Sequence, residues 1–162
     1  MTWTTKPPIG TQLDFTNTIN NGLVGFWILN EGTGIVVNDL SGNGNIGTLK
    51  YMSDPPTITS GWTTNVNQPV LRFDGIDDKL NINTLISTLS TNINGTIAIW
   101  VKLLQNNNLE QTILSITNNA NATRTEFYIN ADFRPGNNNI DVRLQKDGII
   151  QWRFKTIANS LN

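Results

Sequence analysis

The sequence lacks cysteine and histidine altogether, and each absence excludes a class of chemistry. Without cysteine the chain has no disulfide, no thiolate nucleophile and no cysteine-based metal site. Without histidine, Ser-His and Cys-His nucleophilic systems and histidine-based zinc sites are excluded within the chain. A chain without disulfides fits either assembly inside a cell or an extracellular protein that is stable without covalent cross-links.

Charge and long apolar runs are also scarce. Charged residues make up 14% of the chain, the formal net charge is −1, and Lys and Arg are scattered along the sequence. Nucleic-acid binders need a clustered positive surface, so we expect no nucleic-acid partner. No apolar run is long enough to span a bilayer, and the polar N-terminus, interrupted by Pro7 and Pro8, has no signal-like apolar segment.

Short stretches of β-branched and aromatic residues, separated by turns rich in Gly, Asn, Asp and Ser, dominate the chain. This pattern, with no helical period, predicts an all-β sandwich of two antiparallel sheets. Asp-Gly pairs at 74–75 and 147–148 predict tight hairpins. Residues 48–69 are predicted to form a long loop or edge segment, and residues 84–90 are predicted to form a helical turn or loop. The predicted strands are 22–29, 35–37, 70–73, 79–82, 96–104, 112–116, 126–131, 140–146 and 149–155.

Four ordered motifs carry a family resemblance. They are G-L-V-G-F-W-x-L-N-E-G-x-G from Gly22, N-D-L-S-G-N-G-N-x-G-T-L from Asn38, L-R-F-D-G-I-D-D-K-L from Leu71 and T-I-A-I-W-V-K from Thr96. Together they resemble the laminin-G-like jelly roll of the concanavalin A-like lectin and glucanase superfamily, over residues 22–157. The resemblance implies a jelly-roll domain over residues 22–162 that lacks the family's C-terminal strands. We therefore expect a fold that is incomplete or is completed by a neighbouring chain through open sheet edges.

Residues 1–21 are predicted to form an extended arm. Pro7 and Pro8 impose an extended path and Gly10 permits a turn, so the arm lies along the domain or reaches a neighbour. This opening resembles those of laminin-G-like proteins encoded by tailed bacteriophages.

We expect the protein not to be an enzyme. Retaining glycosidases need two carboxyl groups about 5 Å apart, and the glucanases of the superfamily carry them as E-x-D-x-E or E-x-D-x-x-E on one strand. The glutamates here are Glu31, Glu110 and Glu126, and none has Asp two positions later.

Two groups of residues are candidates for ligand binding. Trp62, in a loop with Asn65 and Asn67, is either an exposed platform for a sugar ring or a lid over the sandwich edge. Asp74, Asp77 and Asp78 bring carboxylates together in a way that suits calcium, although the default explanation is the Asp-Gly hairpin turn, and their spacing does not match a D-x-D-x-D-G loop.

Other residues receive structural roles or a weaker metal prediction. Asp39, Asn43 and Asn45 form a second, weaker candidate for calcium. Trp27, Phe73 and Trp100 are assigned to the core, with the two tryptophans placed there by the family resemblance.

Two functions follow as expectations. In the first, the chain is a non-catalytic virion component of a tailed phage, a capsid decoration or tail protein assembled in the host cytoplasm. Its partners are then other virion proteins or copies of itself, reached through the arm and the open edges, and cell-surface polysaccharide. In the second, it is a carbohydrate-binding module of a secreted or surface protein, assisted by calcium.

Overall fold

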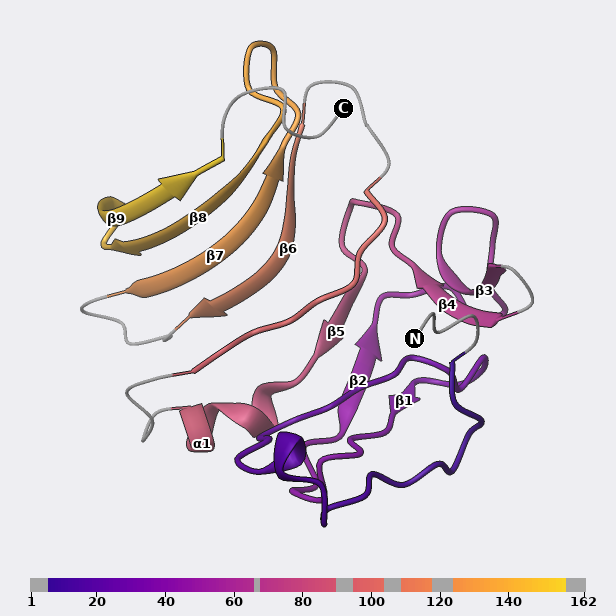
Figure 1. Cartoon of the computed structure of the whole chain (residues 1–162). Coiled ribbons are helices and arrows are strands. Elements are labelled where there is room, and N and C mark those ends of the chain that lie inside the picture. Colours follow the sequence, from indigo (N-terminus) through magenta and orange to yellow (C-terminus); the bar gives the residue numbers. More distant parts are fainter. Residues whose placement is uncertain (1–5, 66–67, 90–94, 104–108, 118–123, 157–162) are drawn as a thin grey trace. The chain divides into compact units, whose positions relative to one another are not determined.

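The structure is a computed structural model, and it describes residues 6–65, 68–89, 95–103, 109–117 and 124–156. The chain divides into two compact units, Met1–Thr96 and Ile97–Asn162, each of which is described by itself. Every paired strand in both units is antiparallel (Figure 1), so the all-β prediction is confirmed. The jelly-roll arrangement stays a prediction.

Among its described residues, the first unit holds two small sheets and three short helical segments. One sheet has the order β1-β2-β5, and the other pairs β3 with β4. Its strands are β1 (Val36–Val37), β2 (Gly47–Lys50), β3 (Gly61–Asn65), β4 (Gln68–Arg72) and β5 (Lys79–Asn81). The helical segments are η1 (Thr18–Asn20), η2 (Asn83–Leu85) and α1 (Ile86–Leu89), of which the last two confirm the helical turn predicted at 84–90.

A small apolar core lies between these strands. Val37, Leu49 and Trp62 are buried and in mutual contact, one from each of β1, β2 and β3. Trp27 and Leu80 are among the partly buried side chains that pack against them. The core therefore joins residues from strands of both small sheets.

Three predictions for this unit are wrong. The Asp74-Gly75 turn does not close a hairpin, because β4 pairs with β3 and β5 pairs with β2. Residues 48–69 are not a single loop, since β2, β3 and the start of β4 fall within them. Residues 22–29 form no strand and are held instead by side chains of the turn that follows β1.

Lys6 and Pro7, at the start of the described part of the arm, lie along their own unit. The Lys6 ammonium donates to the carbonyls of Leu29 at 2.6 Å and Pro69 at 2.7 Å, and its backbone N–H donates to the Gln68 side chain. The Asn30 amide donates to the Pro7 carbonyl at 2.6 Å. Of the two paths predicted for the arm, residues 6–8 follow the one along the domain.

The second unit is a four-stranded meander in the order β6-β7-β8-β9. The strands are β6 (Glu110–Thr117), β7 (Thr125–Asp132), β8 (Asn139–Lys146) and β9 (Ile149–Lys155), which confirms the four predicted here. Asp147 and Gly148 join β8 to β9 with φ of 51° and 78°. Positive φ at both turn residues is the type I′ geometry that matches the twist of a hairpin, and Asp-Gly supplies it at low cost.

Side chains alternate without interruption along the β7–β8 pair, so the two faces of the sheet differ there. On one face Phe127 lies opposite Leu144 and Ile129 opposite Val142; the other face is polar. The pairing register therefore separates an apolar from a polar surface.

The strand predicted at 96–104 is absent from its described part, residues 96–103. Trp100 is fully exposed there. High β-propensity reflects packing and pairing in a sheet, and within the described residues this segment has no ladder partner. Finally, no helix in the described part of the chain is long and apolar enough to cross a membrane.

Candidate functional site

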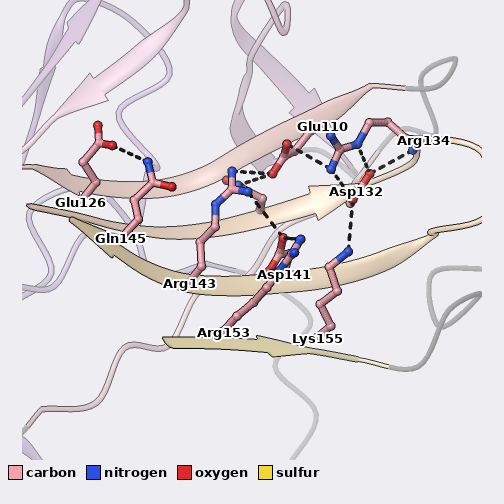
Figure 2. A network of polar contacts seen from close by, with 10 residues as sticks. Glu110, Glu126, Asp132, Arg134, Asp141, Arg143, Gln145, Arg153 and Lys155 are labelled. Atoms are coloured by element: carbon pink, nitrogen blue, oxygen red, sulfur yellow. Dashed lines mark hydrogen bonds and ion pairs between the residues drawn. The ribbon is translucent and has the colours of Figure 1, made fainter. Parts of the chain in front are cut away.

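The polar face of the β6–β9 sheet carries a network of charged side chains that are joined by hydrogen bonds and ion pairs (Figure 2). We call it the charged face. Strand alternation builds it, because every second residue of β7 and β8 points to this side. Its members are Glu110, Arg124, Glu126, Tyr128, Asn130, Asp132, Arg134, Asp141, Arg143, Gln145, Arg153 and Lys155.

Asp132, at the end of β7, is a fully buried carboxylate at the base of this face. Its oxygens accept from Arg134 Nε at 2.8 Å and Nη2 at 2.7 Å, a bidentate pair, and Lys155 Nζ lies 3.7 Å from Oδ2. The hydrogen bonds from Arg134 lower the pKa of Asp132 to about 2, against the opposing effect of burial. Asp132 is therefore an anion at neutral pH.

Asp141, on β8, is a second fully buried carboxylate. Arg153 donates to it from Nε at 2.9 Å and from Nη2 at 2.5 Å, while Arg143 Nη1 lies 3.8 Å away. The hydrogen bonds to Asp141 raise the pKa of Arg153. Each buried aspartate thus lies beneath two cationic side chains.

Glu110, at the start of β6, connects the two groups. Its Oε1 accepts from Asn130 at 2.7 Å and from Arg143 at 2.8 Å, and its Oε2 lies 3.4 Å from Arg134 Nη2. The Arg143 guanidinium also lies over the Tyr128 ring, 5.2 Å from its centroid, in a cation–π contact. The charged groups are therefore one connected network.

Glu126 extends the network along β7. It accepts from Gln145 at 2.5 Å and pairs with Arg124 at 2.5 Å. Hydrogen bonds from Gln145 and Tyr128 lower the pKa of Glu126. Burial, followed by the hydrogen bond to Glu126, raises the pKa of Tyr128. The face thus holds ordered charged and amide groups along the length of β7.

Trp62 is not an exposed platform. Its side chain is 7% exposed, packs in the core of the first unit, and donates through Nε1 to the Gly34 carbonyl at 2.8 Å. A sugar ring needs an open aromatic face, so Trp62 is withdrawn as a ligand-binding residue. Asn65 is exposed at the end of β3, and Asn67 lies outside the described residues.

The structure brings Asp74, Asp77 and Asp78 together. One carboxylate oxygen from each lies within 4.8 Å of the others. Asp78 Oδ2 accepts from the Asp74 backbone N–H at 2.9 Å, whereas the buried Asp78 Oδ1 has no hydrogen-bond partner. Calcium takes oxygen ligands at roughly 2.3–2.6 Å, so oxygens this close can share one ion.

The weaker calcium candidate has a structural role instead. Both oxygens of Asp39 accept hydrogen bonds, from the backbone N–H groups of Phe26 at 2.9 Å, Ser41 at 2.9 Å and Asn45 at 2.7 Å and from the Ser41 hydroxyl at 2.8 Å. Burial opposes ionisation, but these bonds outweigh it and lower the pKa of Asp39. The carboxylate thus fixes the turn against residues 22–29, with further bonds from the Asn43 and Asn45 amides to Val24.

The three residues predicted to lie in the core differ in their burial. Trp27 packs against the core of the first unit, and its Nε1 donates to the Asn45 carbonyl at 2.8 Å. Phe73 and Trp100 are exposed, so their assignment to the core is wrong.

The charged face was missed at the sequence level, although a signal for it exists. In E-F-Y-I-N-A-D and N-I-D-V-R-L-Q, every second residue is polar or aromatic-polar. Two such strands joined by a short loop place these residues side by side. The alternation predicts the strands themselves. Which polar residues of one strand lie beside those of the other depends on the pairing register, which the alternation does not give.

No family model matches this chain, and no curated protein or solved structure matches it either.

Proposed function

We propose that this protein is a non-catalytic adhesion protein that binds cell-surface polysaccharide through the charged face. The observation that carries the proposal is the network around Asp132, Asp141 and Glu110, which holds guanidinium groups in fixed positions on a sheet. Groups held in place before binding lose little conformational entropy when a ligand arrives. Guanidinium and amide groups also hydrogen-bond well to sugar hydroxyl and acid oxygens.

The state of the carboxyl groups supports a binding role over catalysis. A glycosidase needs a general acid whose pKa is raised toward neutrality. On the charged face, hydrogen bonds from Arg134 lower the pKa of Asp132, and a hydrogen bond from Gln145 lowers the pKa of Glu126. Both are poor proton donors at neutral pH.

The setting we propose is the virion of a tailed phage, with the chain as a jelly-roll decoration or tail protein. The support is the resemblance of its motifs and opening to laminin-G-like phage proteins. To test this, particles from source material are separated on a density gradient and the chain is located by mass spectrometry. Recovery only as free protein would remove the virion role and leave polysaccharide binding to be tested separately.

A calcium-assisted carbohydrate-binding module of a secreted or surface protein is the second candidate. The observation that favours it is the approach of Asp74, Asp77 and Asp78 oxygens to within 4.8 Å. An ion there would bridge the protein and sugar hydroxyls or stabilise the turn.

Affinity electrophoresis in gels containing neutral or acidic polysaccharides tests the binding function. We expect retardation by at least one polysaccharide, and loss of retardation in Arg124→Gln together with Lys155→Gln, which leave the bidentate pair of Arg134 and Asp132 in place. Lys50→Gln, at an exposed position on β2, is the matched control and should behave like the wild type. Retardation that survives the double substitution would place binding elsewhere on the chain.

A further inference from the structure

Acidic and basic groups of the charged face lie at different depths. The side chains of Asp132 and Asp141 are 0% exposed, whereas Arg134 is 45%, Arg153 33% and Lys155 30% exposed. Asp132 and Asp141 thus lie at the base of the face, and Arg134, Arg153 and Lys155 lie above them. A ligand that approaches over these two aspartates meets the hydrogen-bond donors of the cations above them.

The outer cations also keep unused donors. A guanidinium has five N–H groups, and a bidentate pair with a carboxylate occupies two of them. Arg134 and Arg153 bind their aspartates through Nε and Nη2. Among the hydrogen bonds of the described residues, none uses Nη1 of either arginine. The aspartates therefore fix the plane of each guanidinium while Nη1 stays free for a ligand.

Sheet register sets the spacing of these cations. Arg143 on β8 lies opposite Arg153 on β9, and Lys155 lies opposite Asp141. Neighbouring strands are about 4.8 Å apart. Arg143 and Arg153 therefore present their guanidinium groups from neighbouring strands, with Lys155 on the same strand as Arg153.

We propose that the charged face binds an acidic polysaccharide, one that carries carboxylate or sulfate groups along its chain. This inference rests on the proposed polysaccharide-binding function and adds the chemical class of the ligand. A neutral glycan offers hydroxyl donors as well as acceptors, and the two aspartates that would accept from it are buried. An anionic group accepts from several fixed donors at once and gains from charge assistance.

Nucleic acid is a polyanion too, but this face suits it poorly. The carboxylates beneath the cations neutralise most of their charge, whereas nucleic-acid binders depend on an excess of positive charge over many phosphates. Single-stranded binders add aromatic platforms for the bases. Tyr128, the aromatic residue of this face, has Arg143 over its ring.

The test compares polymers that differ only in charge. Polygalacturonate and its methyl ester form one pair, and dextran sulfate and dextran form the other; binding of the intact chain is measured by calorimetry. We expect binding to at least one charged member and a Kd at least about tenfold weaker for its neutral partner, a difference of about 1.4 kcal/mol. Raising salt from about 50 to about 300 mM should weaken binding to the charged member.

Substitutions then test whether the ligand binds to the charged face. Lys155→Gln and Arg124→Gln remove partly exposed cations and should each weaken binding several-fold, with Lys50→Gln as the control. Thermal unfolding of each variant separates lost binding from lost folding.

Other outcomes would overturn the inference in distinguishable ways. Equal binding to charged and neutral partners would refute the acidic ligand while keeping the proposed polysaccharide function. Binding to none of the four polymers would remove both. Tighter binding to single-stranded DNA than to every polysaccharide would assign the face to nucleic acid.

Discussion

Arg143 on β8 and Arg153 on β9 lie directly opposite each other, and both guanidinium groups reach the carboxylate of Asp141. Like charges at opposed positions of a sheet destabilise it. The buried carboxylate offsets this repulsion, so Asp141 is the counter-ion that allows two arginines to occupy neighbouring strands.

Asp141→Asn should therefore destabilise the protein strongly. The substitution leaves two arginines opposed without their shared anion, and removing one partner of a buried ion pair costs about 3–5 kcal/mol. Because the arginines are partly exposed, we expect about 3 kcal/mol, measured by urea unfolding. Adding Arg153→Gln should recover part of the loss, whereas Asp77→Asn, at an exposed position, should change stability by less than about 0.5 kcal/mol.

The lowered pKa of Asp132 predicts a defined loss of stability in acid. Its pKa is about 2 in the folded chain against 3.8 for an ordinary aspartate. A carboxyl group with a lowered pKa stabilises the folded state fully above the ordinary value, and this contribution is lost as pH falls toward the lower one. The stability difference between the wild type and Asp132→Asn should therefore be largest above about pH 4 and shrink toward about pH 2. Urea midpoints measured at several pH values test this; a difference independent of pH would contradict the lowered pKa.

The strands that could be predicted are those whose signals are local. In the second unit, alternation along 126–131 and 140–146 and the Asp147-Gly148 turn predict three neighbouring strands, and the structure contains them in that order. A hairpin needs only its own two strands and turn. Asp74-Gly75 carries the same turn signal, yet β4 and β5 take other partners, because pairing over long distances is not encoded in the turn.

The candidate site could be predicted only in part for the same reason. The three aspartates at 74, 77 and 78 are close in sequence, so their proximity in space follows directly. Glu110 and Arg143 lie 33 positions apart, and their contact depends on the register of β6, β7 and β8. The sequence around Trp62 allowed either an exposed platform or a lid, and the choice depends on long-range packing, which buries the ring in a core.

Asp39 provides a third prediction. Asp39→Ala removes an acceptor from the backbone N–H groups of Phe26, Ser41 and Asn45, and residues 22–29 have no sheet to hold them. Hydrogen bonds to a charged group contribute about 1.5–3 kcal/mol, so we expect a loss of about 3 kcal/mol. Hydrogen exchange should show faster exchange at Phe26 and Asn45. Asp54→Ala, at an exposed position, is the control, and equal losses for both variants would exclude a special role for Asp39.

Trp62 is buried and Trp100 is exposed, so substituting each by alanine gives a matched pair of stability measurements. Trp62→Ala removes a core side chain and its hydrogen bond to Gly34, so it should cost about 3–5 kcal/mol of unfolding free energy. Trp100→Ala removes a fully exposed ring and should cost less than about 0.5 kcal/mol. Trp62→Phe should fall between them, because it keeps most of the packing and loses the N–H donor. A small effect of Trp62→Ala combined with lost polysaccharide binding would restore the stacking role.

The aspartates of the β4–β5 loop give the last prediction. If one ion is shared by Asp74, Asp77 and Asp78, a ligand that binds only the folded state stabilises it by about 2.7 kcal/mol at a hundredfold excess over Kd. The melting temperature should therefore rise with calcium and fall when EDTA is added. Asp77 is the exposed member, so Asp77→Asn should abolish the calcium-dependent rise and leave the melting temperature in EDTA nearly unchanged. Asp54→Asn should keep the full response. Identical melting temperatures in calcium and EDTA would mean that hydrogen bonds within the turn, such as that from Asp74 to Asp78, are sufficient to hold the loop.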